Sequence, residues 1–242
     1  LDSCWPIPGV LQPLLEPREF FMMAPPTRTL HWGIYGPVTA QIRHHQRPNR
    51  LMPKPAKKKF KTLQGQLLLD GGGLGGSCFH RSVVLVCEHT PEGALGLVLT
   101  QPGTQLVEDS LPGEVPPAFQ GGYLFEGGPV QPTALSYLYS TPEHLMGNVL
   151  PELTIGHQIE ELQELMNSAT ADLQLKVFSG YAGWSPGQLD NEMRQKSWLT
   201  TPADLHRIFK IPPEDLWKTL LRQRPKWQER ILAEAPDDIA SN

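Results

Sequence analysis

Residues Arg81 to Pro102 read RSVVLVCEHTPEGALGLVLTQP, two apolar runs joined by a short turn. The first run, Val83 to Val86, is β-branched and aliphatic, and the second, Ala94 to Leu99, is interrupted only by a glycine. Thr90 to Gly93 lies between them and contains proline and glycine, which favour tight turns. We therefore predict a β-hairpin. Because neither run alternates with polar residues, we expect it to be buried on both faces.

Hydrophobic patterns outside the hairpin predict further strands and helices. Apolar residues recur at helical spacing from Gln158 to Ser168. Capping residues followed by proline predict helix starts at Ser185, Thr201 and Pro212, and Pro225 is expected to open a last short helix. Short apolar runs predict strands over residues 64–70, 123–130, 133–140 and 173–178, whereas the proline-rich stretch 102–120 is expected to be a loop.

The order of these elements defines a fold class. Strand, hairpin, strand, helix, strand and helices predict an α+β domain over residues 63–236, with a frayed tail at 237–242. The sheet should be mostly antiparallel, because hairpins dominate over strand-helix-strand units.

Residues 1–62 differ in composition from the rest of the chain. They hold ten of the 25 prolines, which remove backbone donors, so we expect a disordered, proline-rich and basic extension. A second interpretation is a nucleic-acid-binding tail that uses Lys54, Lys57, Lys58, Lys59 and Lys61. Met52 precedes this basic run as an ordinary bacterial start would, so we also expect translation to begin there and residues 1–51 to be an upstream over-extension.

Charge is divided unevenly along the chain. Residues 1–62 carry ten Lys and Arg against three Asp and Glu, and residues 63–242 carry eleven against 22. An acidic domain does not favour phosphate backbones, so nucleic acid would have to bind through the basic extension. No apolar window approaches the roughly 18–20 residues of a membrane span, and no basic start marks a signal peptide. We expect a cytoplasmic protein, and three cysteines without framework spacing fit a reducing compartment.

Four segments carry a resemblance to a known family. In chain order they are FHRSVVLVCEH at 79–89, EGALGLVL at 92–99, GGPVQP at 127–132 and GYAGWSPGQL at 180–189. On these segments the chain resembles the AlgH-like (YqgE) family of bacterial proteins. The resemblance implies a single domain built on a bent, mostly antiparallel, partly barrel-like sheet with helices packed outside. It implies no reaction, because the family looks like one without an established activity. The family is named after a link to regulation of alginate exopolysaccharide in one bacterial group.

The chain departs from the family pattern at a few positions. Asp70 and Gly71 stand where the family usually has a small residue and proline, Thr100 where Asn is common, and Tyr139 where His is frequent.

Cys87, Glu88 and His89 form the first candidate site. Cys87 and His89 are two apart on a predicted strand, so both should point to one face, where the imidazole could activate a redox-sensitive or nucleophilic thiol. The alternative is an inert buried cysteine. Cys78 and His80 would complete a zinc-compatible set, but the spacing fits no common zinc pattern, so we expect neither metal nor cofactor.

The two glycine-rich turns form the second candidate. If they converge with Cys87, Glu88 and His89, they would line a cleft for a small ligand or peptide. Its other residues would be Glu126, Gly127, Gly128, Pro129, Tyr181, Trp184 and Gln188. The alternative is that the glycines serve turns and Trp184 packs in the core.

These observations favour a non-catalytic regulatory or interaction protein that binds an unknown protein partner, with transcription-related regulation as one form of that role. An uncharacterised ligand-binding protein or enzyme that uses Cys87, Glu88 and His89 is the main alternative. A nucleic-acid-binding regulator acting through the basic tail is the third. No membrane partner is expected.

Overall fold

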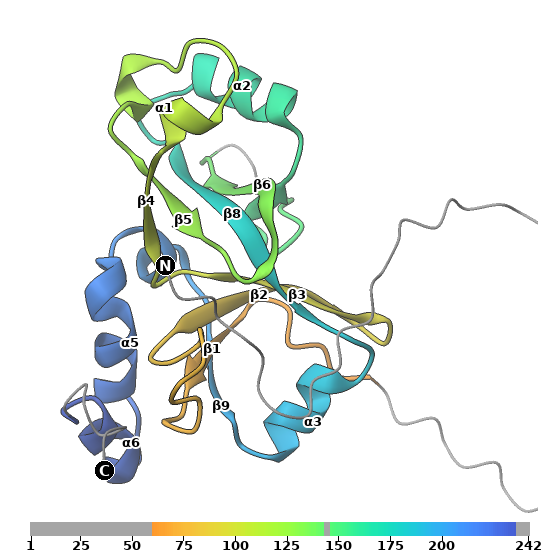
Figure 1. The fold of residues 1–242 in the computed structure, drawn as a ribbon, viewed down its shortest axis with the longest axis vertical. Coiled ribbons are helices and arrows are strands. Elements are labelled where there is room, and N and C mark those ends of the chain that lie inside the picture. Colours follow the sequence, from red (N-terminus) through yellow and green to blue (C-terminus); the bar gives the residue numbers. More distant parts are fainter. Residues whose placement is uncertain (1–59, 143–145, 236–242) are drawn as a thin grey trace, which may run out of the picture. The chain divides into compact units, whose positions relative to one another are not determined.

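The computed structural model describes residues 60–142 and 146–235, which form an α+β fold (Figure 1). The strands are β1 Gln66–Asp70, β2 Val83–Thr90, β3 Gly93–Val98, β4 Pro102–Leu106, β5 Tyr123–Glu126, β6 Val130–Ser140, β7 Thr154–Gly156, β8 Gln174–Trp184 and β9 Trp198–Pro202. The helices are α1 Val107–Ser110, α2 Ile159–Asn167, α3 Gln188–Arg194, α4 Leu205–Phe209, α5 Pro213–Arg222 and α6 Trp227–Leu232, with a 3₁₀ turn at Pro117–Phe119. The predicted fold class is confirmed.

Strand β8 joins the two halves of the sheet. Its first half pairs with β6 and, in parallel, with β5, and its last residues pair with β3. The strand order is β4-β5-β8-β3-β2-β1-β9, and β6 and β7 branch from β8. Figure 1 shows β8 running from the upper group of strands into the lower group. The sheet is bent and mostly antiparallel, as expected, and stays open, with β4 and β9 at its ends.

Three apolar clusters hold this sheet. Leu216, Trp217 and Leu220 of α5 pack on the face of β1 and β2 that carries Leu67 and Leu85. The opposite face of these strands packs against α3, and α1 and α2 cover the half of the sheet formed by β5, β6 and β8. Burial of this kind contributes about 25 cal/mol per Å² of apolar surface. With α5 on one face and α3 on the other, the central hairpin is buried on both faces, as its unbroken apolar runs predict.

Several boundaries differ from those predicted. The expected loop at residues 102–120 contains β4, whose Pro102 pairs with Phe125 at the sheet edge, and the short helix α1. Strand β8 continues to Trp184 instead of ending at Phe178, because Gly180, at φ +65°, and Gly183 let it bend and remain paired.

Two predicted helix caps are also wrong. Ser185 does not cap α3; its N–H donates to the Gln188 side chain, and Gly187 occupies the cap position. Helix α4 is capped by Asp204 rather than Thr201, since the Asp204 carboxylate accepts from the Arg207 N–H at 2.8 Å. The start of α5 at Pro213 agrees with prediction.

Asp70 organises the glycine-rich loop after β1. This carboxylate is fully buried and accepts from the backbone N–H groups of Gly72, Leu74 and Arg81 at 2.8, 3.2 and 2.8 Å. Three charge-assisted bonds satisfy it without a ligand. The loop is thus held by an aspartate at a position where the family resemblance implied a small residue.

Some predictions fall outside the described residues. They include the basic side chains of Lys54, Lys57, Lys58 and Lys59 and the tail at 237–242. Within residues 60–142 and 146–235, no helix is long and apolar enough to cross a membrane.

Candidate functional site

A β-bulge in β2 separates Cys87 from His89. Val86 pairs with Gly96 and Glu88 pairs with Leu95, so Cys87 is an extra residue that shifts the alternation of side chains. Cys87 joins the apolar cluster beneath α5, whereas His89 pairs with Ala94, which packs on the α3 side. The prediction that Cys87 and His89 point to one face is therefore wrong.

Cys87 lies inside the core. It is 3% exposed, and its Sγ lies 3.7 Å from the Leu85 carbonyl oxygen. Burial raises the pKa of the Cys87 thiol, because a thiolate there would lose its hydration. Glu88 points outward and is exposed. The arrangement disfavours a nucleophilic cysteine at this position.

His89 faces α3 and is almost fully buried. Its Nδ1 accepts from the Leu63 N–H at 3.0 Å, and the Phe60 ring meets it edge-on at a centroid distance of 4.9 Å. A neutral imidazole that accepts at Nδ1 carries its proton on Nε2. That Nε2 lies 3.8 Å from the Asp190 Oδ2 on α3. The bulge thus aims the His89 N–H at a carboxylate near the surface.

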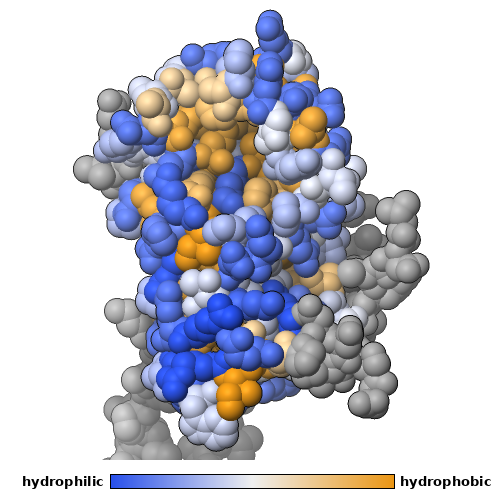
Figure 2. All heavy atoms as spheres, turned by 90° about the vertical axis from the view of Figure 1, so that its left-hand side faces the viewer, coloured by the Kyte–Doolittle hydropathy of each residue, from blue (hydrophilic) through white to orange (hydrophobic). Residues whose placement is uncertain are grey.

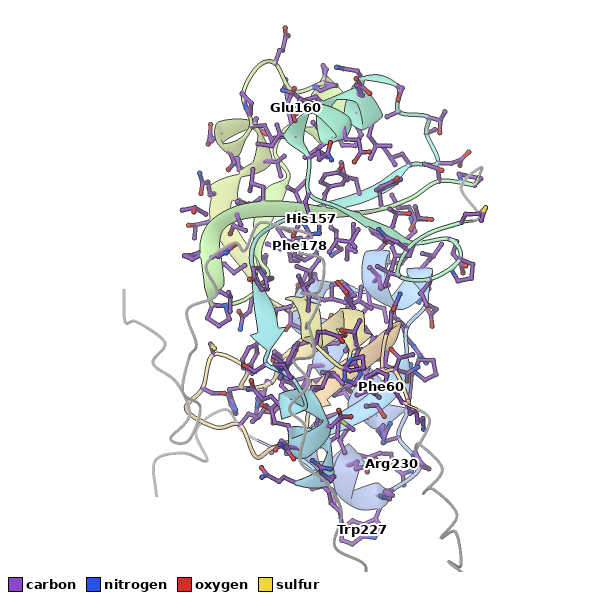
Figure 3. The ribbon with its side chains drawn as sticks, turned by 90° about the vertical axis from the view of Figure 1, so that its right-hand side faces the viewer. Phe60, His157, Glu160, Phe178, Trp227 and Arg230 are labelled. Carbon is purple, nitrogen blue, oxygen red and sulfur yellow. The ribbon has the colours of Figure 1, made fainter. Side chains whose placement is uncertain are left out.

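A hollow of about 550 Å³ lies at this carboxylate. This volume falls within the roughly 300–1,000 Å³ typical of small-molecule sites. The hollow is lined by Lys61, Leu63, Gly187, Asp190, Met193 and Arg194. Figure 3 shows Phe60, whose ring contacts His89, in the lower part of the domain, which also contains α3. We call this feature the α3 hollow.

The two glycine-rich turns meet, but without a cleft between them. The Gly127 N–H donates to the Ser179 carbonyl at 2.8 Å, and the Gly127 carbonyl accepts from the Val98 N–H at 2.9 Å. A side chain at Gly127 would overlap the Gly180 carbonyl oxygen, and one at Gly128 would overlap the Tyr181 backbone. The backbones pass too closely to admit a ligand, so this glycine crossing is part of the scaffold. Glu126 and Pro129 are exposed beside it.

Trp184 and Gln188 belong to a polar anchor rather than a binding surface. The indole N–H groups of Trp184 and Trp198 donate to Glu192 Oε2 at 2.9 and 2.8 Å, and Gln188 Nε2 donates to Oε1 at 3.0 Å. Glu192 of α3 thereby ties β8 to β9 and satisfies two indole donors at the core boundary. Trp184 is 8% exposed.

The family can now be identified by comparison. The sequence model of the AlgH-like family matches residues 67–226. The chain belongs to this family. It is 33% identical over 185 residues to a UPF0301 protein of Chlorobium luteolum, which covers 74% of this chain and 95% of that protein. It is also 33% identical over 191 residues to one of Streptomyces avermitilis, with 76% and 97% covered.

Solved structures agree with this assignment to the AlgH-like family. The solution structure of the AlgH protein from Pseudomonas aeruginosa aligns with a TM-score of 0.58 at 26% identity, covering 76% of this chain and 99% of that one. A crystal structure of a protein from Corynebacterium diphtheriae aligns with the same TM-score at 22% identity, covering 74% and 95%, and shares the fold.

A second hollow of this AlgH-like domain, about 770 Å³, lies between α4 and α5. Asp204, Arg207 and Lys210 contribute from the α4 side, and Asp215 and Gln223 from α5. Arg207 is already engaged by the Asp204 carboxylate at 3.2 Å and by the Pro202 carbonyl at 2.6 Å. Figure 2 shows mostly polar residues on the lower half of the face that carries α5 and α6, and more apolar residues on its upper half.

The described residues contain no group of three or more His, Cys, Asp or Glu arranged to hold a metal ion. His80 instead lies 3.7 Å from Asp70, and Cys87 is sealed in the core. The zinc-compatible set of Cys78, His80, Cys87 and His89 is therefore not assembled. Of the residues singled out in the sequence, Lys61 lines the α3 hollow, and His89 lies 3.8 Å behind Asp190, which also lines it.

Proposed function

We propose that this AlgH-like protein is a non-catalytic interaction protein that serves regulation, including regulation linked to transcription. One observation carries the proposal: Cys87, the glycines and Trp184 of the family motifs are used by the scaffold. Cys87 fills the core, the glycines let two backbones cross, and Trp184 donates to Glu192. No nucleophile with an adjacent base and oxyanion donors is formed by these motif residues.

The outer surface supports binding. Two hollows lie outside the core, and each presents both cations and carboxylates. Such surfaces suit recognition of partners by charge and shape.

A genetic test separates this proposal from an enzyme that uses Cys87 and Glu88. A strain lacking the gene is complemented with the wild-type chain, with Cys87→Ala and with Glu88→Gln, and the transcript profiles are compared. We expect both variants to restore the wild-type profile, because neither side chain takes part in a reaction. The proposal is overturned if either variant accumulates as folded protein but fails to restore it.

A chemical test addresses the thiol directly. Native protein is treated with iodoacetamide near pH 7, and peptides containing Cys87 are quantified by mass spectrometry. We expect Cys87 to react far more slowly than a free peptide thiol, because burial disfavours the reactive thiolate. Fast labelling of Cys87 in the folded protein would contradict the proposal.

A further inference from the structure

The α3 hollow presents three charged side chains that do not neutralise one another. Lys61 and Arg194 are exposed cations, and the Asp190 side chain is 43% exposed. Among the described residues, no ion pair within 4.0 Å joins Asp190 to Lys61 or Arg194. Arg194 donates only one of its five N–H groups, to the Asn191 side chain. The hollow therefore offers both signs of charge to an incoming molecule.

His89 lies behind the carboxylate of this hollow. The imidazole is 2% exposed, is fixed from behind by the Leu63 N–H, and presents Nε2 to Asp190. The Asp190 carboxylate receives no hydrogen bond from any other described side chain. The 3.8 Å between His89 Nε2 and Asp190 Oδ2 is too long for a hydrogen bond, so the Asp190 carboxylate stays available to a ligand.

Apolar surface adjoins these charges. Leu63 and Met193 line the hollow, and Phe60, 40% exposed, lies against His89. The exposed Phe60 ring adds apolar surface beside the hollow. A thioether and a leucine side chain extend that surface.

We propose that the α3 hollow binds a mononucleotide. Lys61 and Arg194 bind its phosphate, Asp190 accepts a hydrogen bond from its ribose hydroxyl or base amine, and Leu63 and Met193 contact its base. A nucleotide combines an anion, hydrogen-bond donors and a flat apolar ring, and each has a counterpart here. Inorganic phosphate would leave Asp190 and the apolar wall unused. A free amino acid would occupy only part of a hollow of about 550 Å³.

This inference goes beyond the proposed interaction role and does not depend on it. A nucleotide in the α3 hollow would lie on the opposite side of β1 and β2 from α5, away from the α4–α5 hollow. Failure of nucleotide binding would leave the interaction role to be decided by its own genetic test.

The test is calorimetric titration of the full chain at constant ionic strength. The probes are the four common nucleoside monophosphates, adenosine and inorganic phosphate. We expect saturable binding of at least one monophosphate, with adenosine weaker than AMP if AMP is the ligand and phosphate weaker still. Arg194→Ala should weaken monophosphate binding by about tenfold or more. Asp190→Asn should weaken the monophosphate and its nucleoside by similar factors.

Lys210→Ala is the matched control, because Lys210 is an exposed cation that lines the other hollow. It should leave every affinity unchanged. The amide resonance of Leu63 reports on the site by NMR, since this N–H donates to His89. The proposal is overturned if no monophosphate saturates, if inorganic phosphate binds as tightly as the nucleotides, or if Lys210→Ala weakens binding as much as Arg194→Ala.

Discussion

The glycine crossing is built from AlgH-like motif segments, whereas the residues that line the α3 hollow, apart from Gly187, lie outside those segments. At the crossing, backbone donors and acceptors of Gly127 are paired and no space remains for even a methyl group. At the hollow, Lys61, Asp190 and Arg194 remain available around about 550 Å³ of space. Motif residues can therefore close one part of a fold, while the groups available for binding lie outside the motifs.

The first prediction concerns a substitution that disrupts the glycine crossing. In Gly127→Ala, the new methyl group would overlap the Gly180 carbonyl oxygen and press on Leu97, so two paired strands must separate. We expect the free energy of unfolding to fall by at least about 3 kcal/mol, measured by urea denaturation. Gly75→Ala is the control, since its Cβ meets nothing within 4 Å and its φ is not positive. Equal effects of the two substitutions would show that the crossing is looser than described.

The second prediction concerns the anchor that holds α3 above the hollow. Glu192→Ala leaves two indole N–H groups and the Gln188 amide without their acceptor. Buried donors that lose a partner are costly, so we expect a loss of about 2 kcal/mol in urea denaturation. Tryptophan fluorescence should also change, because Trp184 and Trp198 lose a charged neighbour. Glu160, exposed on α2 (Figure 3), provides the control substitution Glu160→Ala, which should change neither quantity.

The third prediction concerns Lys176, a partly buried charged residue of β8. The Lys176 ammonium lies 4.1 Å from the centre of the Phe125 ring. Burial lowers the pKa of Lys176 from its ordinary value of 10.5 to about 8, and Glu214 opposes this only in part. Because the charged form is disfavoured in the folded state, Lys176→Met should stabilise the protein by about 1 kcal/mol at pH 7, allowing for partial exposure.

The sign of the Lys176 effect can be checked by pH. Between pH 8 and 10.5 the unfolded state binds more protons at Lys176 than the folded state. The free energy of unfolding of the wild type should therefore increase relative to that of Lys176→Met as pH rises through this window. The measurement is a pair of urea titrations at several pH values, and a constant difference between the variants would contradict the lowered pKa.

The sequence predicted the sheet better than the site. Unbroken apolar runs located the hairpin, and apolar residues at helical spacing located α2, because burial dictates both patterns directly. The bulge at Cys87 was not predictable, since no local signal distinguishes an extra strand residue from a paired one, and it reversed the face assigned to His89. The predicted strand ended at Phe178, before the end of β8 at Trp184, because glycines at 180 and 183 usually signal a turn.

The residues of the α3 hollow were missed for a related reason. Lys61 was interpreted as part of a basic tail, and Asp190 and Arg194 belong to no motif that pointed to a site. The only local signal was that Asp190 and Arg194 lie four residues apart, on one helical face. Their meeting with His89 and Lys61 depends on contacts distant in sequence, which periodicity cannot supply.

The smallest expected effect concerns Asp190 in the α3 hollow. Asp190→Asn keeps the shape of the side chain and removes its charge, and the nearest polar partner, His89 Nε2, lies 3.8 Å away. Because this carboxylate makes no hydrogen bond with any described side chain, we expect the free energy of unfolding to change by less than about 0.5 kcal/mol. The same urea titration used for Gly127→Ala measures it. A loss comparable with that of Glu192→Ala would mean that Asp190 is a structural partner of His89, and the contrast between the two regions would disappear.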